Sequence, residues 1–210
     1  MALDLEEQEQ VAELRAWWQQ YGSLITAAIT AAAVAFAGWQ AWRWYERGQA
    51  AQAGALFDTL ARAVQAGDAK ALRDAGGALL ENHSRTLYAS MGALAAARFY
   101  FDRNDLKSAK AQLQWVAENG RTDEFRDIAR LRLAAVLLDE KAHDEALKLL
   151  EEKHGAAFDA EYAALKGDVL VAKNEAEPAR AAYRLALEKS GSGNNAFRES
   201  VRMRLEALGG

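Results

Sequence analysis

The feature that most limits the folds open to this chain is a long uncharged stretch near its amino end. No charged residue occurs between Arg15 and Arg43, and residues 24–39 read LITAAITAAAVAFAGW. Extended to Trp44, the segment has 21 residues. A helix of that length, rising about 1.5 Å per residue, is about 31 Å long, which matches a bilayer core of about 30 Å. The segment therefore predicts a single membrane-spanning helix.

Aromatic residues gather at both ends of this segment. Five of the six tryptophans of the chain lie there, together with two tyrosines. The residues are Trp17, Trp18 and Tyr21 before the segment, and Trp39, Trp42, Trp44 and Tyr45 at its far end. Because amphipathic rings prefer the headgroup zone, two aromatic clusters about one bilayer apart are typical of a spanning helix. We predict that these seven side chains are membrane-interface anchors.

The residues before the segment favour an anchor that is not cleaved. Ala35-Phe36-Ala37 resembles a signal-peptidase site, but the preceding tail carries five carboxylates against Arg15 alone. A secretory signal peptide begins with a basic region instead. We therefore expect an acidic tail over residues 1–22, a transmembrane anchor over 23–45 and a further domain over 46–210.

The composition of that further domain excludes several classes of protein. The formal net charge of −4 lies almost wholly in the acidic tail, and from Glu46 onward 24 basic residues nearly balance 25 acidic ones. Such a domain has no basic stripe for a phosphate backbone, so nucleic-acid binding is not expected. Cysteine is absent, which excludes disulfides and thiolate metal sites. Many alanines and a single proline favour helices.

Beyond residue 46 the sequence predicts an all-α fold of repeated helix pairs. Small and large residues recur at fixed offsets, at intervals of 37 and 33 residues. The positions are Ala97, Ala134 and Gly167; Tyr100, Leu137 and Leu170; Ala109, Ala146 and Ala179; and Leu113, Leu150 and Tyr183. A period near 34 is that of tetratricopeptide repeats, in which small residues let paired helices touch. We expect a helical-repeat solenoid.

The repeat gives unit boundaries and a candidate binding groove. We expect regular units over 86–119, 123–154 and 158–190, a less regular unit over 47–82, and a capping helix over 195–208. The first helices of the pairs would line a partner-binding groove. Its predicted residues are Met91, Leu94, Arg98, Phe101, Ile128, Leu131, Ala135, Leu138, Ala164, Asp168 and Val171. Such a groove suits an amphipathic helix or an extended apolar segment. For residues 128–138, which are apolar nearly all round, packing in the core is an equal alternative.

No catalytic pattern stands out in the sequence. The three histidines, His83, His143 and His154, do not form a metal-binding spacing. There is no GxSxG, Walker A or GxGxxG motif. We therefore predict a protein that is not an enzyme, with no cofactor, no metal site and no small-molecule substrate.

Three stretches resemble the YfgM family of ancillary SecYEG translocon subunits. They are ARLRLAAVLLDEKAHDEALKLLE over 129–151, EYAALKGDVLVAKNEAEPARAAYRLALE over 161–188, and the tail EEQEQVAELRAWWQQYG over 6–22 that leads into the anchor. The resemblance covers nearly the whole chain. It implies an inner-membrane protein with a cytoplasmic amino terminus and a periplasmic repeat domain. The implied partners are SecYEG, the membrane-anchored prolyl isomerase PpiD and newly exported proteins. The implied role is that of a chaperone-like adaptor, and the resemblance implies no catalytic residues.

The charges around the anchor favour a different orientation. One basic residue, Arg15, precedes the segment, whereas Arg43, Arg47 and Arg62 follow it. The positive-inside rule would then place the repeat domain in the cytosol. The alternative function is a membrane-tethered scaffold that organises a membrane complex from the cytosolic side. The charge difference is only two residues, so we expect the periplasmic orientation.

Overall fold

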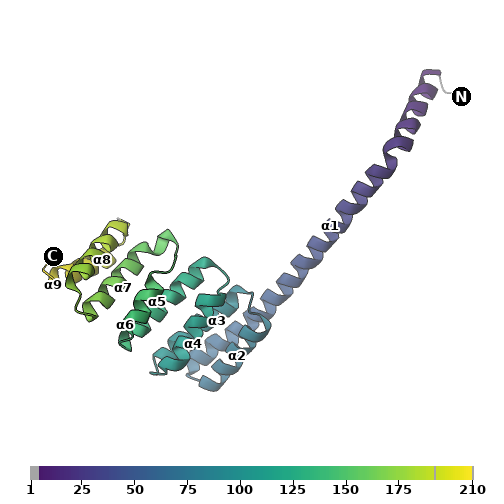
Figure 1. Cartoon of the computed structure of the whole chain (residues 1–210). Coiled ribbons are helices and arrows are strands. Elements are labelled where there is room, and N and C mark those ends of the chain that lie inside the picture. Colours follow the sequence, from purple (N-terminus) through teal and green to yellow (C-terminus); the bar gives the residue numbers. More distant parts are fainter. Residues whose placement is uncertain (1–4, 192, 210) are drawn as a thin grey trace. The chain divides into compact units, whose positions relative to one another are not determined.

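The computed structural model describes residues 5–191 and 193–209, and every element in these two ranges is helical (Figure 1). The predicted all-α fold is therefore confirmed. The helices are α1 (Leu5–Ala66), α2 (Ala69–Asn82), α3 (Leu87–Phe101), α4 (Leu106–Asn119), α5 (Asp123–Asp139), α6 (His143–Leu150), the 3-10 helix η1 (Ala156–Phe158), α7 (Asp159–Ala172), α8 (Ala176–Lys189) and α9 (Asn195–Ala207). The chain divides into two compact units, Met1–Gln49 and Ala50–Gly210.

The first unit consists of the amino-terminal part of α1. An 18-residue window of this helix has a mean hydropathy of 1.6, and only 6% of the window is buried. The hydroxyls of Thr26 and Thr30 each donate to the carbonyl oxygen four residues earlier, at 2.8 Å, so these polar groups are satisfied within the helix. The helix is long and apolar enough to cross a membrane. Within the predicted acidic tail, Asp4 and the side chains of residues 5–9 lie outside what the structure describes.

The second unit is a row of helix pairs. The last part of α1 shares a core with α2, α3 packs against α4, α5 against α6, and α7 against α8 (Figure 1). These pairs correspond to the four repeat units expected from the sequence. Each pair also packs against the next one along the chain, and α9 packs against α8. The resulting core runs through three adjoining clusters of buried apolar side chains.

The two helices of each pair are joined by the same kind of turn. One residue in each turn has a left-handed backbone: Gly67 (φ 73°), Asn104 (60°), Lys141 (63°) and Asn174 (63°). The amide of the next residue donates to the carbonyl oxygen five residues back, as in Asp105 to Tyr100 at 2.9 Å and Ala142 to Leu137 at 2.8 Å. This bond is the one that ends a helix in a Schellman motif. The less regular first pair therefore has the same turn as the other three.

Short polar side chains cap the amino ends of several of these helices. Asp68 accepts hydrogen bonds from the amides of Lys70 and Ala71, at 2.9 and 3.0 Å. Asp105 accepts one from the amide of Ser108, at 3.1 Å, and hydrogen bonding by the Ser108 side chain and backbone lowers the pKa of Asp105. Each bond satisfies an amide that has no partner within the helix, and so fixes the residue at which the helix starts.

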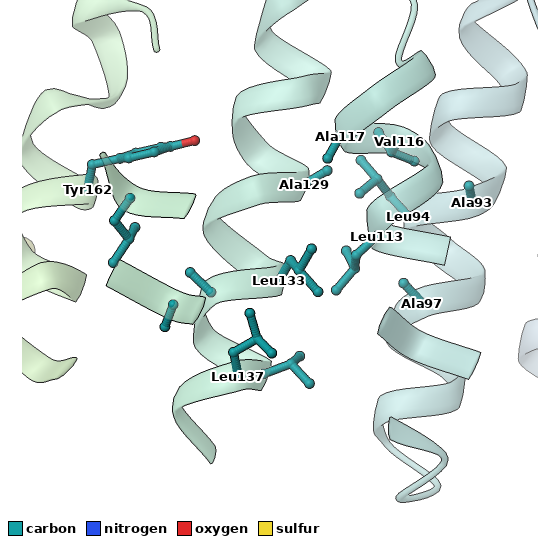
Figure 2. Close-up of a cluster of buried hydrophobic side chains, with 14 of the residues drawn as sticks. Ala93, Leu94, Ala97, Leu113, Val116, Ala117, Ala129, Leu133, Leu137 and Tyr162 are labelled. Carbon is teal, nitrogen blue, oxygen red and sulfur yellow. The ribbon is translucent and has the colours of Figure 1, made fainter. Parts of the chain in front are cut away.

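Small residues let the helices approach closely. In the central cluster, alanines stand between α3, α4 and α5 while leucines from all three helices fill the space around them (Figure 2). One such close contact is between α7 and α8. A Cβ atom at Gly167 would lie 2.4 Å from the ring of Tyr183, well inside van der Waals contact. At this position of the repeat pattern, glycine therefore leaves the space that the ring of Tyr183 occupies.

A buried carboxylate ties the third pair to the fourth. Asp127 on α5 is 2% exposed and accepts hydrogen bonds from the amide of Gly155, at 2.9 Å, and from Arg130, at 3.0 Å. Its backbone carbonyl accepts a hydrogen bond from the hydroxyl of Tyr162 on α7, at 2.9 Å. The ring of His154 stacks on that of Tyr162, with centroids 3.9 Å apart. Because every polar atom named here has a partner, the network fixes the register between α5 and α7.

Helix α9 covers the end of the row. Val201 is fully buried against α8, and Phe197, Leu205 and Leu208 pack partly against the same cluster. One turn after Val201, Arg204 donates to both carboxylate oxygens of Asp168 on α7, at 2.7 and 3.0 Å. The apolar residues Val201 and Leu205 of α9, and Leu208 just after it, thus face the core.

Candidate functional site: a pocket between α3 and α5

A pocket with a volume of about 350 Å³ opens between α3 and α5. On α3, its lining residues are four and three positions apart, so they form a single helix face. The lining residues are Leu94, Ala97, Arg98 and Phe101 from α3, Leu113 from α4, and Arg132, Ala135, Val136 and Asp139 from α5. The floor is apolar, and charged side chains stand at the rim.

The sequence-predicted residues of α3 largely reach this pocket. Leu94 is 8% exposed and belongs to the floor, whereas Phe101 is 37% exposed and lies at the mouth. Arg98 lines the pocket and pairs with Asp102 across one helical turn, at 2.8 Å. Met91, also predicted, is 38% exposed on the same helix but does not line the pocket.

The face of α5 that lines the pocket is not the face that the sequence suggested. Of the predicted residues, only Ala135 lines it. Ile128, Leu131 and Leu138 instead pack partly buried against the central core cluster. The alternative of core packing, open for these residues at the sequence level, is therefore the arrangement found. The polar residues of α5 occupy the pocket rim because apolar side chains gain more from the core.

The remaining predicted residues lie on α7, away from the pocket. Val171 is 38% exposed at the surface. Ala164 is 4% exposed and belongs to the last core cluster. Asp168 accepts hydrogen bonds from the hydroxyl of Tyr183, at 2.8 Å, and from Arg204, so it holds α7, α8 and α9 together. The structure thus assigns these three residues to the surface, the core and an inter-helix contact.

Two charged residues of the pocket were missed by the sequence reasoning. Arg132 and Asp139 line the rim, and within the described part of the chain neither side chain has an ion pair or a hydrogen bond. Both stand on the helix face that also carries Ala135 and Val136, three and four residues apart. That spacing was visible in the sequence, but the apolar residues 128, 131 and 138 gave the stronger signal for the neighbouring face.

A second, larger hollow of about 780 Å³ runs along α4, α5 and α6. Its lining is rich in charged side chains, several of which already have partners. Arg130 pairs with both Asp127 and Glu152, at 3.0 and 2.9 Å, and Arg126 pairs with Asp123. Arg126 and Arg130 are therefore neutralised within the chain, whereas Glu145 and Lys148, which also line the hollow, have no ion pair or side-chain hydrogen bond among the described residues.

The chemistry available in the pocket is that of binding. An apolar floor with a half-exposed aromatic ring and unpaired charges at the rim can accept an apolar side chain and fix its neighbours by charge. No group of three or more histidine, cysteine, aspartate or glutamate side chains that could hold a metal ion occurs among the described residues.

The seven predicted membrane-interface residues are all exposed on α1. Their rings pair along the helix, as in Trp17 with Tyr21, whose centroids are 5.8 Å apart, and Trp42 with Tyr45, at 6.1 Å. The guanidinium of Arg43 lies 4.9 Å from the centre of the Trp39 ring. Exposed aromatic and basic side chains at the end of an apolar helix are typical of interfacial anchoring.

The chain is similar to known proteins over almost all of its length. A family model for a tetratricopeptide repeat-like domain matches residues 15–210. Proteins named ancillary SecYEG translocon subunit match at 30% identity in Haemophilus influenzae and 29% in Neisseria gonorrhoeae, each over 99% of this chain and 100% of the relative. The Escherichia coli protein of that name matches at 26% identity over 96% of both chains. No solved structure matches the chain significantly.

The helix pairs, their shared turn and the apolar part of α1 define a class: tetratricopeptide-like repeat proteins with an amino-terminal candidate membrane anchor. Proteins of this class bind other proteins through their repeats and are of a non-catalytic kind. Within that class, the chain belongs to the family of ancillary SecYEG translocon subunits. The resemblance noted in the sequence is thereby confirmed.

Proposed function

We propose that this protein is a non-catalytic adaptor, anchored in the inner membrane by residues 23–45, whose repeat domain binds partner proteins at the SecYEG translocon. The relatives are named as ancillary subunits of that translocon. The observation that carries the proposal is the pocket between α3 and α5, which combines an apolar floor with unpaired charges on Arg132 and Asp139. Such a pocket suits an amphipathic segment of another protein.

The proposed partners are SecYEG, the membrane-anchored prolyl isomerase PpiD, and newly exported polypeptides. An amphipathic helix from a fixed partner and an exposed apolar segment of an unfolded chain both place an apolar side chain next to polar ones. The pocket therefore suits either kind of ligand. The adaptor would act in a chaperone-like way by covering apolar segments until they are buried elsewhere.

The proposed orientation places the repeat domain in the periplasm and the acidic tail in the cytoplasm. A cytosol-facing scaffold is the second candidate, favoured by Arg43, Arg47 and Arg62 after the apolar segment against Arg15 before it. Alkaline phosphatase fused after Gly210 distinguishes the two, since this enzyme matures only outside the cytosol. Active phosphatase supports the periplasmic orientation, and an inactive but intact fusion supports the scaffold.

Phe101→Glu tests the pocket. Placing a carboxylate at its mouth should weaken capture of SecYEG and PpiD by the full chain in mild detergent by about tenfold or more, since a truncated pocket anchor costs on the order of 2 kcal/mol. Leu185→Glu on α8 is the matched control, because Leu185 is 44% exposed and does not line the pocket. Helix content should be unchanged in both variants. Equal capture by both would rule out this pocket as the binding site.

A further inference from the structure

A third pocket, outside the site described above, is lined by three arginines. Its volume is about 450 Å³, and it lies where the turn between α2 and α3 meets the turn between α4 and α5. The lining residues are Ser84, Arg85, Asn119, Gly120, Arg121 and Arg126. None of them is acidic, although the repeat domain as a whole has nearly equal numbers of acidic and basic residues.

Two of the three guanidinium groups are available to a ligand. Arg126 donates to the carbonyl oxygen of Gly120, at 2.6 Å, and pairs with Asp123, so it is held within the loop and largely neutralised. The side chains of Arg85 and Arg121 are exposed, and neither makes an ion pair or a hydrogen bond within the described residues. The loop itself is fixed, because the amide of Arg121 donates to the buried hydroxyl of Ser90, at 3.0 Å.

This arginine-lined pocket lies on one edge of the second unit, Ala50–Gly210. The chain enters the unit from α1 at the same edge. The last part of α1 runs parallel to α3. A Cβ atom at Gly54 would lie 3.4 Å from the ring of Tyr88, near the start of α3, whereas one at Gly67 would lie 3.2 Å from Arg103, beyond its end. Residues 50–54 therefore lie at the same edge as the turn that carries Arg85.

The chain that connects the predicted anchor to the repeat unit is short. Only four residues lie between Tyr45, the last aromatic residue of the anchor, and Ala50, the first residue of the repeat unit, so the two are five steps apart along the chain. Even fully extended, five residues span at most about 18 Å. If Tyr45 lies at the membrane interface, as the proposed function requires, residue 50 begins the repeat unit within about 18 Å of that interface.

We propose that Arg85 and Arg121, in the pocket that Arg126 also lines, form a binding site for a phosphate group, supplied in the anchored protein by the headgroup of an anionic phospholipid. Planar guanidinium groups bind phosphate oxygens by paired hydrogen bonds, and Ser84 and Asn119 add neutral donors. The anchor raises the local concentration of headgroups, so a membrane lipid outcompetes free phosphate. This inference rests on the proposed anchoring of residues 23–45 but not on the pocket between α3 and α5.

Amide hydrogen exchange of the full chain in lipid nanodiscs tests the site. Discs of phosphatidylcholine are compared with discs that contain increasing fractions of phosphatidylglycerol, and exchange is followed over residues 83–86 and 119–126. Phosphatidylglycerol should slow exchange there in the wild type. In Arg85→Gln/Arg121→Gln, the equilibrium constant for this contact should fall about 30-fold, or about fivefold for each arginine lost near an anionic surface.

Arg73→Gln/Arg184→Gln is the control, since it removes the same charge from exposed arginines outside the pocket and should behave like the wild type. Inorganic phosphate added to phosphatidylcholine discs, at the same bulk phosphate concentration, should not slow exchange. The proposal is overturned if phosphatidylglycerol does not slow exchange in the wild type, or if it slows exchange equally in Arg85→Gln/Arg121→Gln. It is also overturned if free phosphate alone slows exchange. SecYEG capture by Arg85→Gln/Arg121→Gln should equal that of the wild type, so failure here leaves the proposed function intact.

Discussion

At the scale of single residues, Gly167 shows how the repeat pattern is enforced. The ring of Tyr183 fills the space where its side chain would be, with ring carbons 2.4 to 2.9 Å from the position that a Cβ atom would occupy. That ring cannot turn away freely, because its hydroxyl donates to Asp168, which in turn binds Arg204. One glycine thus permits the contact that brings three helices together.

Gly167→Ala should lower the free energy of unfolding by about 1–3 kcal/mol, the usual cost of forcing extra volume into a packed core. The loss should exceed the gain in helix propensity from replacing glycine, which is about 1 kcal/mol at most. Denaturant unfolding of the full chain in detergent, followed by helix content, measures the change.

Gly77→Ala is the matched control. Gly77 lies in the middle of α2, and a Cβ there would meet nothing within 4 Å. This variant should gain about 0.5–1 kcal/mol because alanine loses less entropy than glycine in a helix. A loss of stability in both variants, or in neither, would contradict the close approach between α7 and α8.

At the scale of elements, the alternation of small and large residues predicted the helix pairs, because spacing alone decides which residues meet between adjacent helices. The same reasoning failed for the pocket face of α5. Residues 128–138 are apolar on almost every side, so periodicity could not tell which side faces the core. Arg132 and Asp139 were missed for that reason, and only the packing of α5 against α3 and α4 places them at the rim.

The turns were a second feature that the sequence only partly revealed. Glycine and asparagine at positions 67, 104 and 174 suit a left-handed backbone, but Lys141 does not, so the four turns did not look alike. For a residue with a Cβ atom, this conformation costs about 1 kcal/mol or more in free energy. The turn is adopted there because the same hydrogen bond, from Ala142 to Leu137, ends α5.

Lys141→Gly should therefore raise the free energy of unfolding by about 1 kcal/mol, since glycine adopts the left-handed backbone without strain. Lys148→Gly, within the regular helix α6, should lower it by a similar amount because glycine there only adds entropy to the unfolded chain. Thermal or denaturant unfolding measures both changes. If the two substitutions had the same sign, the strain assigned to Lys141 would be absent.

At the scale of the whole molecule, two buried tyrosines link stability to alkaline pH. Burial raises the pKa of Tyr162, and the nearby charge of Asp127 raises it further; burial and the hydrogen bond to Asp168 do the same for the pKa of Tyr183. In the unfolded chain a tyrosine has a pKa of about 10. The folded state therefore keeps these protons to a higher pH than the unfolded chain does. The contribution of the two tyrosines to the free energy of unfolding is fully present below a pH of about 10 and declines as the pH rises further.

The expected result is that phenolate absorbance and loss of helix content coincide for these two tyrosines as the pH rises. Tyr183→Phe removes one of the two groups and should make the decline in stability with pH shallower, even if the variant starts from a lower stability. Complete ionisation of every tyrosine with helix content unchanged would contradict the burial of both rings.

The neighbour-to-neighbour packing of the repeat unit has a consequence for how the domain acquires its structure. Contacts that join adjacent helices require only short loops to close, so little chain entropy opposes each step, and proteins dominated by such contacts fold quickly. A chain supplied from its amino end could complete one hairpin of helices for about every 34 residues delivered. The last helix pair to form would expose apolar side chains of its core until α9 folds and Val201 covers them.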